Sequence, residues 1–186
     1  MFFTSDTHFG HKNIIKHSNR PFANVDEMTN VIVNNYNRVT NKHSIIYHLG
    51  DFSFYKPAIT LEIIASIDCK EIVLIRGNHD KKLDKLLSNK FRVHDCLELG
   101  INHKKIVLFH FPLYVWNKSH YGSYHLHGHS HNSLNPQYYE NRKALDVGVD
   151  NPLCNYGLFT FDMVDKLLKD KTFKAVDHHN SVDLTQ

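Results

Sequence analysis

Histidine, aspartate and asparagine recur together in short segments of this chain, which has 186 residues and 16 histidines. Their side chains offer imidazole nitrogen and carboxylate or amide oxygen atoms, a mixed donor set that suits divalent transition metals. Mg²⁺ and Ca²⁺ prefer shells of oxygen alone. The candidate segments are Asp6-Thr7-His8, Gly50-Asp51, Gly77-Asn78-His79-Asp80, His110 and Gly128-His129-Ser130-His131. Together they predict a metal site.

Each of these segments follows a run of residues that is expected to form a strand. Short β-branched runs predict buried strands at 1–4, 45–47, 71–75 and 105–109, and apolar periodicity predicts helices at 25–39, 58–67 and 81–87. The alternation indicates a mainly parallel sheet with helices on its faces. Because ligands bind beyond the carboxyl ends of such strands, the polar segments are expected to converge there. Later segments at 124–127, 144–149 and 157–162 predict a second sheet, so the expected fold class is an α/β two-sheet sandwich flanked by helices.

Each segment taken alone has an ordinary structural explanation. Gly50-Asp51 is a common turn sequence, Asn78 and Asp80 are of the types that cap helices, and His110 could simply end a strand. Short motifs also match by chance. Five such segments at strand ends are a different observation, because convergent ligand types define a site.

Length and composition indicate one globular domain. A chain of 186 residues with 41% hydrophobic and 22% charged residues is typical of a single folded domain. We expect this domain to span residues 1–170. Residues 171–186 lack apolar periodicity and are expected to form a surface tail. The sequence carries no indication of oligomeric state.

Charge and hydropathy narrow the range of partners. No apolar run approaches the roughly 18 residues needed to cross a bilayer, and Asp6 comes too early for a signal peptide. We therefore expect a cytoplasmic protein with no membrane partner. Lysine and arginine number 22 against 19 acidic residues, a formal charge of +3 without blocks of like charge. This argues against a nucleic-acid partner, which would require a basic track.

The ordered segments resemble the motifs of the calcineurin-like metallophosphoesterase family over residues 1 to about 160. The segments at 77–80 and 128–131 are the most specific parts of the resemblance. It implies a two-sheet α/β sandwich and two divalent transition-metal ions, drawn from Mn, Fe, Zn, Co and Ni, with Mn the first choice in vitro. It also implies their ligands: Asp6, His8 and His131 for one ion, Asn78, His110 and His129 for the other, and Asp51 bridging both.

The same resemblance implies that His79 lies beside the ions without binding them. There it would donate a proton to the leaving alkoxide or stabilise charge on the phosphoryl oxygens. Asp80 is the second candidate catalytic residue and would orient the imidazole of His79, although a carboxylate in the first turn of a helix explains it equally well. Asp146 and Asp150 are candidates for hydrogen bonds that support metal-binding histidines.

Four further residues are candidate contacts for the substrate. A guanidinium group matches a phosphate in shape and charge, so Arg20 could reach the substrate, although a surface ion pair is the simpler explanation. Trp116, Lys118 and His120 belong to the long loop after His110 and are candidates for gripping the organic part of a substrate. A core role is equally open for Trp116.

The resemblance implies a binuclear metal-dependent phosphoric ester hydrolase in which an activated water attacks phosphorus in line. We expect a phosphodiesterase for a small or nucleotide-like substrate, because a chain of this length has little left over for a cap that encloses a monoester. A phosphomonoesterase, including a protein phosphatase, and a nuclease are the alternative enzymes. A non-catalytic scaffold of the same fold is disfavoured, because all seven ligand positions and His79 have the expected residue types.

Overall fold

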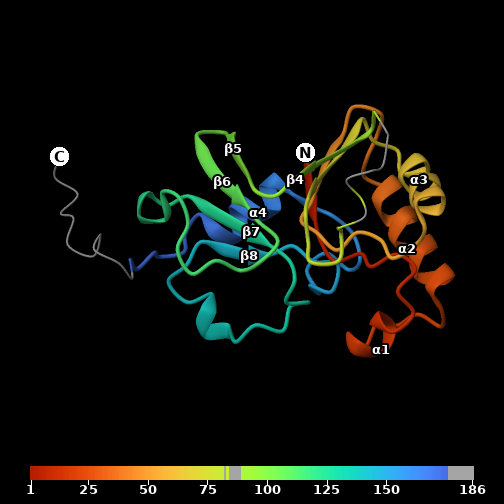
Figure 1. The fold of residues 1–186 in the computed structure, drawn as a ribbon. Helices are drawn as coiled ribbons and strands as arrows, with labels where there is room; N and C mark the ends of the chain where they lie inside the picture. The colour runs from red at the N-terminus through yellow and green to blue at the C-terminus, as the bar shows by residue number, and fades with distance from the viewer. Residues whose placement is uncertain (82, 84–88, 176–186) are drawn as a thin grey trace.

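The computed structural model describes residues 1–81, 83 and 89–175, and its strands form two sheets (Figure 1). The first sheet contains β1 (Phe2–Thr4), β2 (Ile45–His48), β3 (Glu71–Ile75), β4 (Phe91–His94) and β9 (Phe159–Thr160). The second contains β5 (Leu97–Ile101), β6 (Lys104–Leu108), β7 (Tyr124–His127) and β8 (Ala144–Asp146). Their orders are β4-β3-β2-β1-β9 and β5-β6-β7-β8. Only β9 against β1 and β5 against β6 pair antiparallel.

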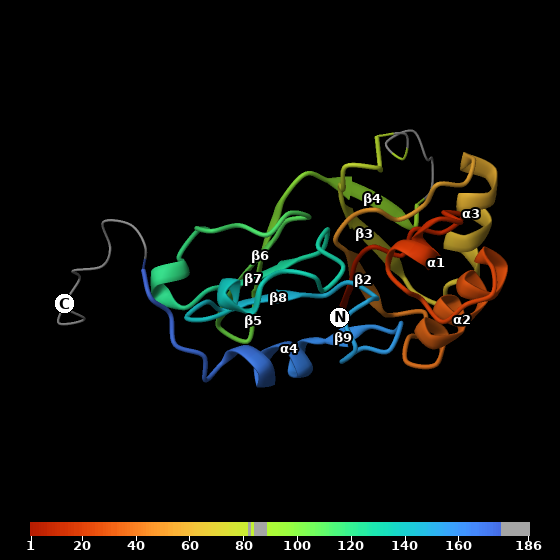
Figure 2. The same cartoon turned by 90° about the horizontal axis from the view of Figure 1, so that it is seen from below.

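Helices flank the two sheets. They are α1 (Ile14–His17), α2 (Val25–Asn37), α3 (Pro57–Ser66) and α4 (Phe161–Leu168), with the 3-10 turns η2 (Ser119–Tyr121) and η3 (Pro136–Tyr138). Figure 2 shows α2 and α3 beside the first sheet and α4 beside the second. The buried residues of α4, Val164 and Leu168, belong to the apolar cluster that joins the two sheets.

The sequence of α2 explains both where it begins and which face it buries. Met28, Ile32 and Tyr36 recur every four residues and are the buried side chains of this helix. Asn24 caps its start, because its side chain accepts hydrogen bonds from two backbone N–H groups of the first turn. The buried face belongs to the cluster formed with the first sheet.

A second apolar cluster joins the two sheets to each other. Phe3 and Val73 come from the first sheet and Ile106 and Leu126 from the second, and all four side chains are buried. Because β1, β2 and β3 are parallel, as are β6, β7 and β8, each sheet presents several carboxyl ends at one edge. The fold thereby gathers the loops that follow these strands.

The predicted α/β two-sheet sandwich is confirmed, with differences at its edges. Residues 157–162 were predicted to form a strand of the second sheet, but β9 pairs with β1 in the first sheet. The strand stops early because the side chain of Thr160 accepts a hydrogen bond from the backbone of Met163 and begins α4. Strands β4 and β5 were not predicted.

Two predictions fall partly on residues that the structure does not describe. The helix predicted at 81–87 lies mostly outside the described residues. Within the predicted tail at 171–186 only residues 171–175 are described, and Thr172 and Lys174 hydrogen-bond to Asn141 there. In the described ranges no helix has the length and apolarity that a membrane crossing requires.

Candidate metal centre

Several predicted ligands hold an uncommon backbone conformation on the loops that follow the strands. Asp6, His8, Asp51, His129 and His131 have φ values between 47° and 67°. Positive φ is rare for residues other than glycine and tends to cluster at functional sites. The backbone N–H of His129 donates to the Asp6 carboxylate, which joins the loop after β7 to the loop after β1.

Two glycines allow these loops to approach each other closely. Gly50 has a φ of 98°, and a Cβ at this position would collide with Nδ1 of His110. A Cβ on Gly128 would collide with the side chains of Ser5 and Asp6. The glycine of each motif is therefore required for packing around the predicted ligands.

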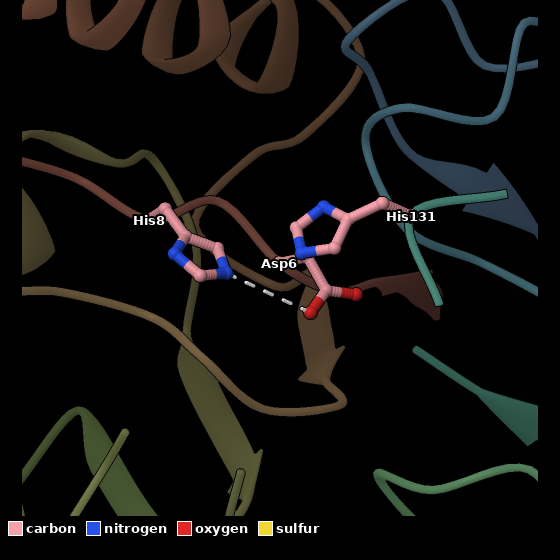
Figure 3. A group of neighbouring side chains, drawn as sticks. All are labelled: Asp6, His8 and His131. Carbon is pink, nitrogen blue, oxygen red and sulfur yellow. Dashed lines mark ion pairs between the residues drawn. The ribbon is translucent and has the colours of Figure 1, made fainter. Parts of the chain in front are cut away.

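The side chains of Asp6, His8 and His131 point toward one another (Figure 3). One potential ligand atom of each lies within 4.8 Å of those of the other two, and Asp6, Asp51 and His110 satisfy the same distance limit. Asp6 belongs to both groups. The two groups consequently form one continuous cluster of potential ligands.

Asp51 lies between the two predicted metal positions. Its Oδ2 is 3.5 Å from Nε2 of His8 and 3.7 Å from Nε2 of His110. The side-chain oxygen of Asn78 is in turn 3.1 Å from Nε2 of His110 and 3.1 Å from Nδ1 of His129. The fold thus brings all seven predicted ligands together in the arrangement expected for a bridging Asp51, and their binding of metal stays a prediction.

Unpartnered polar atoms indicate that this cluster suits a cation. Oδ1 of Asp6 and Nε2 of His8 are buried without a hydrogen-bond partner and lie 3.9 Å apart. Such atoms are unfavourable inside a protein, and a cation between them would satisfy both. Burial raises the pKa of Asp6 well above its usual value and lowers the pKa of His110 to about 4. A neutral imidazole is the form that binds metal, and a bound cation would favour the Asp6 carboxylate.

Two of the histidines are oriented by hydrogen bonds on the side away from the cluster. Nδ1 of His131 is 2.7 Å from the Asp150 carboxylate, and Nδ1 of His110 is 2.7 Å from the backbone carbonyl of Leu49. Such bonds leave Nε2 of each ring available for a metal. Asp150 therefore orients His131, and its support of a metal ligand stays a prediction. Asp146 instead supports the loop, because it accepts hydrogen bonds from Ser130 and from backbone N–H groups.

Arg20 was predicted to contact the substrate, but the structure commits its guanidinium elsewhere. Its side chain is fully buried and pairs with Asp150 through Nε and Nη2, both at 2.7 Å. The remaining N–H groups donate to the carbonyls of Asp6 and Thr7 and to the sulfur of Met28. All five guanidinium donors are thereby used. Arg20 holds Asp150, and through it His131, instead of reaching a phosphate.

Arg20→Ala is therefore expected to lower the free energy of unfolding by about 3 to 5 kcal/mol, because it leaves the Asp150 carboxylate buried without its cation. Denaturant titration measures this loss. Arg38→Ala is the matched control, since Arg38 is exposed, and should change stability by less than about 0.5 kcal/mol. If Arg20→Ala left the free energy of unfolding unchanged and raised KM, Arg20 would instead be a substrate contact.

Asp80 was predicted to orient His79, and the structure gives its carboxylate another task. The side chain is fully buried and accepts hydrogen bonds from the backbone N–H groups of Asp51, Phe52 and Gly77, at 2.7 to 2.9 Å. It therefore turns inward, away from a catalytic position. Asp80 ties the loop that carries Asp51 to the turn that carries Asn78.

His79 lies at the margin of the cluster, and its role in catalysis stays a prediction. Its side chain is 45% exposed, and Nε2 is 3.9 Å from Oδ2 of Asp51. The backbone N–H of His79 donates to Oδ1 of the same carboxylate at 2.9 Å. His79 belongs to neither group of converging ligand atoms among the described residues. An exposed imidazole beside the predicted metals is available to a substrate.

The other predicted substrate contacts lie on a loop that folds back toward the start of β6. Trp116 is buried, and its indole N–H donates to Ser123. Lys118 borders a cleft with Lys104, at the opposite end of β6 from His110, and the ring of His120 packs on Tyr121. The structure thus assigns Trp116 to the core and places Lys118 away from the cluster.

Phe54 is a neighbour of the cluster that the sequence analysis did not single out. Its ring stacks on His11 at 4.3 Å between centroids and lies 4.9 Å from the ring of His79. A phenylalanine carries no ligand atom, so no motif for metal chemistry includes it. Only its position three residues after Asp51 could have indicated from the sequence that it lies near the cluster.

Comparison with known proteins shows the family of this chain. The sequence is 36% identical over 183 residues to the uncharacterized protein MJ1445 of Methanocaldococcus jannaschii, covering 95% of this chain and 96% of that protein. It is 25% identical over 178 residues to the gene 66 protein of Mycobacterium phage L5, covering 80% and 85%. The crystal structure of AQ665, a protein of unknown function from Aquifex aeolicus, superimposes with a TM-score of 0.71 at 26% identity, covering 90% of this chain and 98% of that one. The calcineurin-like phosphoesterase superfamily domain matches residues 1–152, and the chain belongs to that superfamily.

Proposed function

We propose that this protein is a metal-dependent phosphodiesterase that hydrolyses a small or nucleotide-like diester. Its superfamily is one of metal-dependent phosphoesterases. The observation that carries the proposal is that two groups of potential ligand atoms overlap at Asp6. Asp51 lies between His8 of the first group and His110 of the second. Such an arrangement suits two cations that act on one phosphoryl group.

The proposed ligands are those that the family resemblance implies, and the two groups of converging ligand atoms support four of them besides the shared Asp6. Two divalent ions held by these side chains would supply positive charge to the phosphoryl oxygens and lower the pKa of a water nucleophile. The three groups of ligands are Asp6, His8 and His131 for the first ion, Asn78, His110 and His129 for the second, and Asp51 for both.

The chain supplies the remaining functions with its own side chains. His79 is exposed beside Asp51 and would donate a proton to the leaving oxygen of the substrate. The hydrogen bond from its backbone N–H to Asp51 fixes the two residues relative to each other. Asp80 holds the backbone of Asp51 by a hydrogen bond, and Arg20 holds His131 through Asp150.

Two clefts at the cluster favour a diester over a monoester. One, of about 440 Å³, reaches the cluster at Asn78 and His79. The other, of about 620 Å³, reaches it at His129 and His131 and extends to α1. The described residues that border the two clefts are different, and each border includes at least one predicted ligand of the cluster. A phosphodiester has two organic arms to fill both clefts, whereas a monoester has one.

A comparison of aryl esters tests this proposal. With Mn²⁺, kcat/KM for bis-p-nitrophenyl phosphate is expected to exceed that for p-nitrophenyl phosphate by at least about 10-fold, because only the diester uses both clefts. Zn²⁺, Co²⁺, Ni²⁺ and Fe²⁺ are tested in parallel. A preference for the monoester would contradict the diesterase assignment, and no hydrolysis of either ester with any metal would contradict the enzyme assignment.

A further inference from the structure

We infer that the cleft at Asn78 and His79 is the subsite for the leaving arm of the substrate, and that this arm is a nucleoside carrying an additional phosphate. The inference rests on the proposed diesterase function and extends it to the chemistry of one arm. We call this cleft the Phe54 cleft, because it is bordered by Phe54, Lys56 and Lys81 besides Asn78 and His79.

Phe54 offers this cleft an aromatic surface. Its side chain is 41% exposed, although large apolar side chains are usually buried. The ring is held by near-parallel contacts with His11, at 4.3 Å and 19°, and with His8, at 5.3 Å and 18°. A ring held in this way loses little freedom when a ligand contacts the part of it that borders the cleft. Nucleobases are planar and stack on aromatic side chains irrespective of their sequence.

Two lysines give the same cleft positive charge. Lys56 and Lys81 both border it, and within the described residues neither forms an ion pair with a carboxylate. Lys56 also precedes the first turn of α3, whose backbone N–H groups add partial positive charge. The two ammonium groups would attract an anionic group of the ligand, and the adjacent aromatic ring would stack on a planar group of the same ligand. A phosphate on a nucleoside has this chemistry.

The position of His79 identifies which arm occupies the Phe54 cleft. His79 borders this cleft and is absent from the described border of the other, which is formed by His17, Asn19, Ser133 and their neighbours. The oxygen that His79 can reach is consequently the one whose substituent lies in the Phe54 cleft. That substituent is the leaving arm.

Three deoxydinucleotides test the charge requirement: dApdA, pdApdA with a 5′-terminal phosphate, and dApdAp with a 3′-terminal phosphate. One phosphorylated form is expected to exceed dApdA in kcat/KM by about 10-fold, the value of one well-placed phosphate contact. Product analysis should show that its terminal phosphate lies on the nucleoside that departs without the internal phosphate. Equal rates for all three, or acceleration by a phosphate on the retained nucleoside, would overturn the inference.

Variants separate the two features of the cleft. Replacing Lys56 and Lys81 together by Ala should bring the ratio between the preferred phosphorylated dinucleotide and dApdA close to one. Phe54→Leu should lower kcat/KM for dApdA by about 10-fold, and Phe54→Tyr should restore it, because tyrosine also stacks. Tyr114→Leu is the control, since Tyr114 is exposed against Arg142 and does not border this cleft. An unchanged ratio in the lysine variant or unchanged turnover in Phe54→Leu would overturn the inference.

Two further measurements distinguish failure of this inference from failure of the proposed function. Hydrolysis of bis-p-nitrophenyl phosphate by the wild type, without discrimination among the dinucleotides, would overturn the subsite alone. Absence of any diester hydrolysis would overturn both. Metal content of each variant should equal that of the wild type, and a loss of metal in Phe54→Leu would show that Phe54 supports the metal centre instead of the substrate.

Discussion

Asp51→Asn is expected to lower diester turnover by at least about 10²-fold and to reduce the metal content of the purified protein. Loss of a residue that only supports a ligand already costs 10- to 100-fold in metal affinity or activity. Asp51 is nearer to the chemistry than such a residue, because its Oδ2 lies beside His8 and His110, which belong to different predicted ions. The substitution removes negative charge from both positions at once. It should therefore have a larger effect than substitution of any other ligand.

Elemental analysis and initial rates on the same Asp51→Asn sample measure this effect. Asp68→Asn is the matched control, because Asp68 is exposed and should retain wild-type turnover and metal content. Circular dichroism establishes that the Asp51 variant is folded. A folded variant with full metal content and near wild-type turnover would remove Asp51 from the centre.

His79→Ala is expected to lower turnover by about 10² to 10⁴-fold, the usual contribution of a positioned general acid, while metal content stays unchanged. The reason is that His79 lies beside Asp51 with an exposed ring and is not among the seven proposed ligands. His43→Ala is the control, since His43 is exposed and precedes β2, whereas Asp51 follows the carboxyl end of that strand. Loss of a metal ion in His79→Ala would show that the imidazole is a ligand.

The leaving group distinguishes the two roles open to His79. Nitrophenolate departs without a proton, so the defect of His79→Ala should shrink for nitrophenyl esters and be largest for alkyl leaving groups. A defect of equal size for all leaving groups would instead indicate stabilisation of charge on the phosphoryl oxygens. Wild-type turnover of an alkyl diester would exclude His79 from the mechanism.

The positions of the predicted ligands could be derived from sequence because they depend on a simple topological rule. Asp6, Asp51 and Asn78 each follow one of three parallel strands in the first sheet, and parallel strands place their carboxyl ends at one edge. Residue type at a strand end is thus informative even without coordinates. The antiparallel β9 lay beyond this rule: a strand was predicted at 157–162, but a strand of two residues carries too little pattern to show that it pairs with β1 in the first sheet.

The roles of Arg20 and Asp80 could not be derived in the same way. Both are charged, and each charged side chain could have faced the substrate. What decides their roles is direction: Arg20 turns toward Asp150, 130 residues later in the chain, and Asp80 turns inward toward the backbone of Asp51. Contacts over such separations depend on tertiary packing, which a motif does not encode. The same holds for Phe54, which is identified by the rings it touches.

The binding of two metal ions by one chain is the central claim, and counting them is its most direct test. Protein stripped with a chelator is titrated with Mn²⁺, and bound metal per chain is measured by elemental analysis after removal of free ions. We predict saturation at two equivalents, with phosphodiester hydrolysis appearing as the second equivalent binds. Saturation at one equivalent, or no binding, would contradict the binuclear centre.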